Sequence, residues 1–168
     1  MTEDRPIPTR EANVAKVGIE IRVEVEHWRD GHLLSKIRGG DVIGSVGRDV
    51  LANRIGTADP AGRVRYIRAS AIGTGQAAVS SSGLTKLGSV VYHGTAPFSK
   101  SAPTGSFTFN RKFSIGSTYA IRESGLFMGT SKGAALRGTM YSRGTFAVRN
   151  VVSGDSLTLN YTGGMTSG

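Results

Sequence analysis

The 168-residue chain contains no cysteine, which excludes a disulfide framework, a cysteine-ligated zinc cluster and a thiol nucleophile. It also lacks long hydrophobic runs. Residues 1–15 have no apolar segment typical of a signal peptide, and no stretch approaches the roughly 20 residues that cross a bilayer. We therefore expect no membrane span, and a protein that is soluble when made.

Acidic residues become scarce after residue 59. Residues 1–59 carry nine Lys/Arg and ten Asp/Glu, whereas residues 60–168 carry twelve Lys/Arg and only two acids, Glu123 and Asp155. The net charge of +9 therefore belongs to the second part of the chain. Its arginines occur singly rather than in a basic run. This pattern favours a basic surface that faces solvent or an acidic protein partner, and it disfavours nucleic-acid binding.

Signals for long helices are also few, because 24 glycines and an apolar fraction of 38% favour short strands and turns. From residue 17 to residue 26, β-branched residues alternate strictly with glycine and charged residues, which predicts a half-buried strand. Asp30-Gly31 then predicts a tight turn, with Leu33–Ile37 returning antiparallel. We expect a hairpin over residues 17–38.

One short helix is expected over residues 41–56, where apolar residues recur every three or four positions between an N-cap at Asp41 or Ser45 and Gly56. Residues 63–162 hold several short strand-like segments separated by Gly/Ser, which predicts an antiparallel β-sandwich or jelly-roll-like arrangement. The expected organisation is mainly β, with a single β-rich assembly domain over residues 17–168.

The first 16 residues have mixed charge and no hydrophobic period, which predicts an extended N-terminal arm. We expect this arm to order on a neighbouring protein. The candidate contact residues are Arg5, Pro6, Ile7 and Pro8.

One predicted strand carries an arginine in an apolar row. The row consists of Phe107, Phe109, Arg111, Phe113 and Ile115, on one face of an alternating segment. We expect Arg111 to mark either a strand end or a bulge.

A nucleotide site is disfavoured at the glycine-rich stretch that follows Tyr66. A Walker loop needs Lys and then Ser/Thr after its second glycine, and a dinucleotide loop needs a third glycine opening a helix. Here Gly73-Thr74-Gly75 is followed by Gln76 and a small-residue tract. We expect no cofactor, and a turn in which glycine torsions let the chain leave a strand.

Other catalytic or metal chemistry also finds little support. His27 and His32 flank the predicted turn, but only Asp30 or Glu26 is near enough to complete a metal site, so surface or interface histidines are favoured.

Glu123 and Asp155 are the two candidates for a glycosidase-type pair. For Glu123, an ion pair with the adjacent Arg122 or a turn hydrogen bond is the simpler role. Asp155 is typical of a turn acid that opens a strand. We expect no enzymatic activity.

The order of segments over residues 41–162 resembles a pattern in tail-fibre and related virion proteins of tailed bacteriophages. The most specific segment is "IRESGLF" at residues 121–127, and Ser89-Val90 stands where the pattern commonly has Glu-Val. The other matching segments are "DVIGSVGRDVLANRIG", "YIRASAIGTGQAAVSSSGLTKLGSVVYHG", "LRGTMYSRGTFAV" and "VSGDSLTLNYTG".

The resemblance implies a non-enzymatic subunit of a phage virion, made in the host cytoplasm, in a tail, fibre-attachment or baseplate/neck position. It would contact other virion proteins and form a homo-oligomer. The alternatives are a capsid-decorating protein, or a receptor-recognition protein that binds or degrades polysaccharide.

Within "IRESGLF" we expect Ile121, Leu126 and Phe127 in the core, Arg122 and Glu123 holding a turn, and Gly125 where no side chain fits. The residues assigned to the structural motif are Gly73, Gly75, Ile121, Arg122, Glu123, Gly125, Leu126, Phe127, Gly154 and Asp155.

Overall fold

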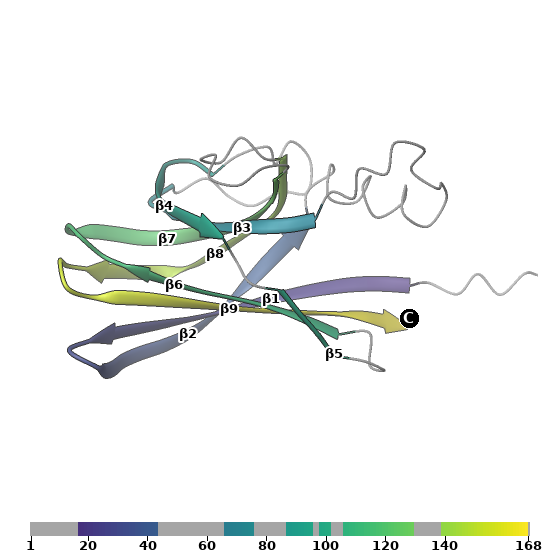
Figure 1. The fold of residues 1–168 in the computed structure, drawn as a ribbon, viewed down its shortest axis with the longest axis horizontal. Coiled ribbons are helices and arrows are strands. Elements are labelled where there is room, and N and C mark those ends of the chain that lie inside the picture. Colours follow the sequence, from purple (N-terminus) through teal and green to yellow (C-terminus); the bar gives the residue numbers. More distant parts are fainter. Residues whose placement is uncertain are drawn as a thin grey trace, which may run out of the picture.

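The computed structural model describes residues 17–43, 66–75, 87–95, 98–101, 106–129 and 139–167. These residues form nine strands of one antiparallel sheet, in the order β4-β3-β7-β8-β2-β1-β9-β6-β5 (Figure 1). The strands are β1 (Val17–Arg29), β2 (His32–Ile43), β3 (Tyr66–Gly73), β4 (Val90–Thr95), β5 (Phe98–Ser101), β6 (Ser106–Ser114), β7 (Tyr119–Gly129), β8 (Thr139–Val151) and β9 (Ser156–Ser167). The mainly β, antiparallel character is confirmed.

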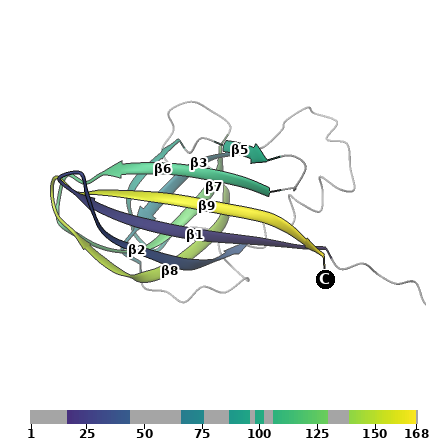
Figure 2. The same cartoon turned by 90° about the horizontal axis from the view of Figure 1, so that it is seen from below.

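The sheet curls until it is nearly closed, because β4 at one end of the strand order also lies against β6 near the other end. The predicted sandwich or jelly roll, with two packed sheets, is not confirmed. A strongly twisted sheet can instead wrap its apolar face around the core by itself. Figure 2 shows this wrapping from below.

The predicted helix is wrong at its start, because Asp41–Ile43 form the end of β2. These residues pair with Ser142–Gly144 of β8, and this tertiary pairing prevails over the local helical period. Residues 44–56 lie outside the described part of the chain. Within the described ranges there is no helix.

The β1–β2 hairpin follows the alternation of its sequence. Ile21, Val23 and Val25 of β1 are buried, while the intervening charged residues lie on the outer face of the sheet. Asp30 and Gly31 both have positive φ, 49° and 79°, as a two-residue turn of the primed type requires. Along its other edge β1 pairs with β9 from Val17 to Trp28.

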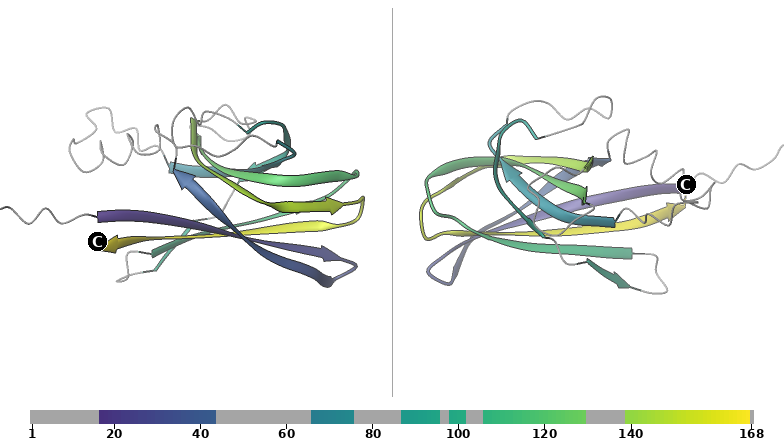
Figure 3. Two further views of the ribbon diagram at one scale, coloured as in Figure 1. Left: turned by 180° about the vertical axis from the view of Figure 1, so that it is seen from behind. Right: turned by 45° about the horizontal axis from the view of Figure 1, so that its top comes forward.

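Toward its turn, this hairpin separates from the neighbouring strand. β2 pairs with β8 only from Gly40 to Ile43, whereas its first part pairs only with β1 among the described strands. Figure 3 shows the hairpin diverging from β8. At the point of divergence the strands approach so closely that a Cβ on Gly39 would lie 2.9 Å from the Thr145 carbonyl oxygen.

Arg111 lies in the middle of β6, and the β6–β9 register has no irregularity there, so the expected strand end or bulge is wrong. The Arg111 guanidinium instead reaches the nearby edge strand. Its Nη1 donates to the Thr95 carbonyl oxygen at 3.1 Å, and its Cζ lies 5.5 Å from the centroid of the Phe113 ring. Gly94 leaves room for it, because a Cβ there would be 2.7 Å from that Cζ. Arg111 therefore covers the seam between β4 and β6.

Candidate functional site

The first polar centre is built around Glu123, in the middle of β7. Its side chain is fully buried, and a register irregularity between Ile121 and Glu123 changes the local pairing with β8. The expectation that Arg122 and Glu123 hold a turn is wrong, because both belong to a continuous strand. The partner of Glu123 is Arg143 of β8 rather than its neighbour Arg122.

Five hydrogen bonds converge on the Glu123 carboxylate. Oε1 accepts from the backbone N–H groups of Gly75 at 2.8 Å and Ser89 at 3.0 Å. Oε2 accepts from the Gly88 N–H at 3.1 Å, and from Nε and Nη2 of Arg143 at 3.0 and 2.7 Å. The carboxylate thus joins the end of β3, the approach to β4, and β8.

These contacts decide the charge state of Glu123. Burial alone would raise its pKa, but the N–H groups of Ser89, Gly88 and Gly75, together with Arg143, more than offset this effect and lower the pKa. Glu123 is therefore ionised at neutral pH.

Glycines leave space for this carboxylate. β3 ends at Gly73, where a Cβ would lie 2.6 Å from Glu123 Oε1. A Cβ on Gly75 would meet the same oxygen and would lie 2.8 Å from the Cα of Gly88. The Gly-Thr-Gly segment is thus a cradle for an anion, but the anion belongs to the protein's own Glu123.

The remaining members of the 121–127 segment are core residues. Ile121 and Leu126 are 0% exposed and Phe127 is 4% exposed. A Cβ on Gly125 would lie 3.1 Å from each of three atoms, on Leu87, Phe127 and Ser142, so a larger side chain has little room. Every residue of this segment except Arg122 is buried.

The second polar centre is Asp155, directly before β9. Its Oδ1 accepts from Arg29 Nε at 2.6 Å, and its Oδ2 accepts from Arg29 Nη2 at 2.9 Å and from the Val152 N–H at 3.0 Å. Oδ2 also lies 2.8 Å from His27 Nε2. The bonds from Arg29 outweigh the effect of burial, and the pKa of Asp155 is lowered. Asp155 therefore holds the β8–β9 turn, in which Gly154 has φ 93°, against the end of β1.

The expectation of surface or interface histidines is wrong for His27, which is only 6% exposed and pairs with Asp155. His27 lies on the inward side of β1, in the same alternating row as Val25. His32 and His93 are exposed. Within the described ranges, no group of three His, Cys, Asp or Glu side chains is arranged to hold a metal ion. The arm residues Arg5, Pro6, Ile7 and Pro8 lie outside those ranges.

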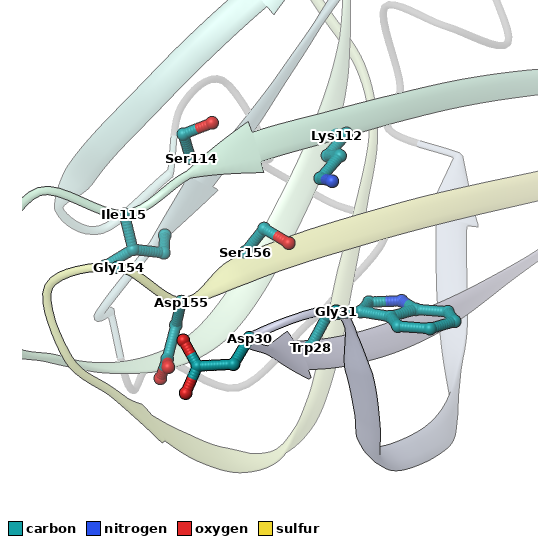
Figure 4. A pocket seen from close by; sticks show the side chains of 9 residues that line it. All are labelled: Trp28, Asp30, Gly31, Lys112, Ser114, Ile115, Gly154, Asp155 and Ser156. Carbon is teal, nitrogen blue, oxygen red and sulfur yellow. The ribbon is translucent and has the colours of Figure 1, made fainter.

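A shallow hollow of about 290 Å³ lies where β1, β9 and β6 run side by side, close to the hairpin turn (Figure 4). Trp28 comes from β1, Ser156 from β9, and Lys112 and Ser114 from β6. Sequence reasoning missed this hollow. The available signal was that Trp28 occupies the polar side of an otherwise regular alternation, two residues before the Asp-Gly turn.

A comparison with protein-family models, curated proteins and solved structures finds no match for this chain. None of the described segments forms a helix long and apolar enough to cross a membrane.

Proposed function

We propose that the protein is a non-enzymatic structural subunit of a tailed-phage virion, in a tail, fibre-attachment or baseplate/neck position. It is made in the host cytoplasm and assembles in the virion as a homo-oligomer with other virion proteins. The observation that carries this proposal is the environment of Glu123. Apart from Arg122, the most specific segment of the phage-like pattern is buried among internal contacts, as in a domain whose task is to hold its shape for assembly.

The same environment argues against hydrolysis by the two scarce acids. A glycosidase acid needs a raised pKa and access to the scissile bond. Glu123 and Asp155 instead have lowered pKa values, and their side chains are 0% and 1% exposed. Their oxygen atoms are occupied by donors from the protein itself, which favours a structural role for both.

A capsid-decorating protein is the alternative position within a virion. The excess of Lys/Arg after residue 59 would suit contact with an acidic protein surface in either position. Electron microscopy of particles that carry a labelled copy distinguishes head from tail. Label on the tail would support the proposal, and label over the capsid surface would show instead that the protein decorates the capsid.

Deletion of residues 1–16 tests the proposed mode of assembly, since an arm that orders on a neighbour adds contact area without belonging to the domain core. We expect the shortened chain to keep its circular dichroism spectrum and unfolding midpoint but to be lost from purified particles. A length-preserving variant with Ser in place of Arg5, Pro6, Ile7 and Pro8 should behave in the same way. Normal incorporation of both variants would contradict the role of the arm.

A further inference from the structure

The outer face of the sheet carries a row of short side chains beside Trp28. In the strand register, Trp28 lies opposite Ser156, and Ser156 lies opposite Ser114. The three side chains therefore project from the same face in one row across β1, β9 and β6. In this row the large Trp28 side chain stands on β1, and the small Ser156 and Ser114 side chains stand on β9 and β6. The side chains of β9 and β6 therefore leave a depression beside Trp28.

Other groups complete the walls of this depression. Lys112 stands in the adjacent row, two residues before Ser114 on β6. Asp30 and Gly31 of the hairpin turn, together with Gly154 of the β8–β9 turn, border it at the end of the strands. Figure 4 shows Ser156 between Lys112 and Trp28, with the indole ring seen nearly edge-on. Its walls are paired strands and two turns, and Asp155 bonds the β8–β9 turn to Arg29 at the end of β1.

The indole of Trp28 is half-buried, and its Nε1 donates to Glu26 Oε2 at 3.2 Å, which fixes the ring on the sheet surface. The face of an indole ring is electron-rich and apolar. It therefore attracts flat groups whose C–H bonds are weakly positive, and the face of a pyranose ring is such a group.

The polar groups that line the hollow include charged side chains and hydroxyl groups. Lys112 supplies a cation, and the hydroxyls of Ser114 and Ser156 can donate or accept. The carboxylates of Asp30 and Asp155 lie together at the turn end of the hollow, away from the indole, and Asp155 is already paired with Arg29 (Figure 4). Among the described residues, Lys112 has no carboxylate within ion-pair distance, in contrast to Lys36, which pairs with Glu24 and Glu26. An exposed ammonium beside a hollow favours an anionic group on the ligand.

We propose that this hollow binds one pyranose ring of a carboxylate-bearing saccharide, such as a uronic acid residue. The ring stacks on Trp28, its carboxylate faces Lys112, and its hydroxyls bond to Ser114 and Ser156. The volume of about 290 Å³ is at the lower limit for small-molecule sites, which suits a single sugar ring. This binding site goes beyond the assembly role and does not depend on it.

Trp28 is the only tryptophan of the chain, so its fluorescence reports on the hollow without labelling. We titrate the full-length protein with glucuronate, galacturonate, glucose and galactose, with acetate as a control for a carboxylate alone. A saturable change is expected with at least one uronate, with a dissociation constant on the order of 1 mM because the site is shallow. The neutral sugars should bind about tenfold more weakly, and added salt should reduce the difference.

Three variants locate the site. Lys112→Gln should remove the preference for the uronate, and Ser114→Phe should abolish binding by filling the hollow. Thr108→Ala, on an exposed position of the same strand, should bind as the parent does. Circular dichroism shows whether each variant is folded. If Ser114→Phe is unfolded, Lys112→Gln, a change at an exposed position, decides the assignment.

The proposal is overturned if no saccharide changes the Trp28 signal in a saturable way, or if glucose binds as tightly as glucuronate. It is equally overturned if folded Lys112→Gln retains the uronate preference. Because these measurements use the isolated protein, their outcome is independent of whether the arm directs incorporation into particles.

Discussion

The Glu123 and Asp155 centres each bury one carboxylate, but they surround it differently. Three of the five hydrogen bonds to Glu123 come from backbone N–H groups, and its cation, Arg143, is 4% exposed in its side chain. At Asp155 a single backbone N–H contributes, and the cation, Arg29, has a side chain 43% exposed. If Asp155 is removed, water can therefore replace some of its hydrogen bonds to Arg29. Water has no comparable access to Arg143.

The two carboxylates therefore have different roles. Glu123 holds several chain segments together, whereas Asp155 holds one turn in place. Glu123 is the common acceptor for segments that are 20 to 48 residues away in the sequence. Its removal leaves several buried donors without a partner at once. Asp155 joins one turn to the end of β1, and its loss affects a smaller part of the fold.

The largest effect is expected for Glu123→Gln, which removes the charge opposite Arg143 with little change in size. Leaving one member of a buried ion pair uncompensated costs about 3–5 kcal/mol. Denaturant unfolding followed by circular dichroism measures the loss. Glu20→Gln is the matched control, because Glu20 forms an exposed pair with Arg22, and it should leave the midpoint unchanged. Equal midpoints for Glu123→Gln and the parent would contradict the organising role.

An intermediate effect is expected for Gly75→Ala, which keeps the carboxylate but disturbs the N–H group that binds it. The added methyl group would contact Glu123 Oε1 and lie 2.8 Å from Gly88 Cα. The backbone and side-chain shifts that such crowding requires should lower the free energy of unfolding by about 1–3 kcal/mol. Gly40→Ala is the control, since no atom lies within 4 Å of a Cβ there. If both variants unfold alike, the backbone cradle does not need glycine.

The smallest effect is expected for Asp155→Asn, with a loss of about 1 kcal/mol at neutral pH, because water can hydrate the partly exposed Arg29 in the variant. The pKa of Asp155 is lowered in the folded protein from an ordinary value of 3.8, so the unfolded chain takes up the proton first as the pH falls. The parent should therefore lose stability as the pH drops below about 4, and the variant should lose less. Asp30→Asn, at an exposed turn position, should follow the parent. Parallel pH curves for Asp155→Asn and the parent would contradict this assignment.

Local pattern was sufficient for the hairpin. The alternation before Asp30 specifies which residues of β1 face the core, and Asp-Gly tolerates the positive φ values of the turn. Alternation does not specify which strands pair, so a single curled sheet and two packed sheets produce the same local pattern. At the end of β2 the local pattern predicts a helix start, because the β8 partners that make it a strand lie about 100 residues later.

The Glu123 and Asp155 centres could not be predicted from the sequence for a related reason. Glu123 could be recognised as one of two rare acids, but its donors come from three separate segments. His27 and Asp155 are separated by 128 positions, and nothing local to either indicates the other. Arg111 is an exception in an apolar row of the sequence, but its hydrogen-bond acceptor lies on β4, which approaches β6 only when the sheet curls.

The long pairing of β1 with β9, from Val17 to Trp28, gives the described part of the chain two distinct ends. Val17 lies opposite Ser167, so the chain enters and leaves the sheet at the same end, while Trp28 opposite Ser156 lies at the other end. At about 3.3 Å per residue, the separation along β1 is roughly 35 Å. An attachment made directly before Val17 or directly after Ser167 therefore lies at the opposite end of these two strands from the Trp28 hollow, and it leaves the hollow accessible.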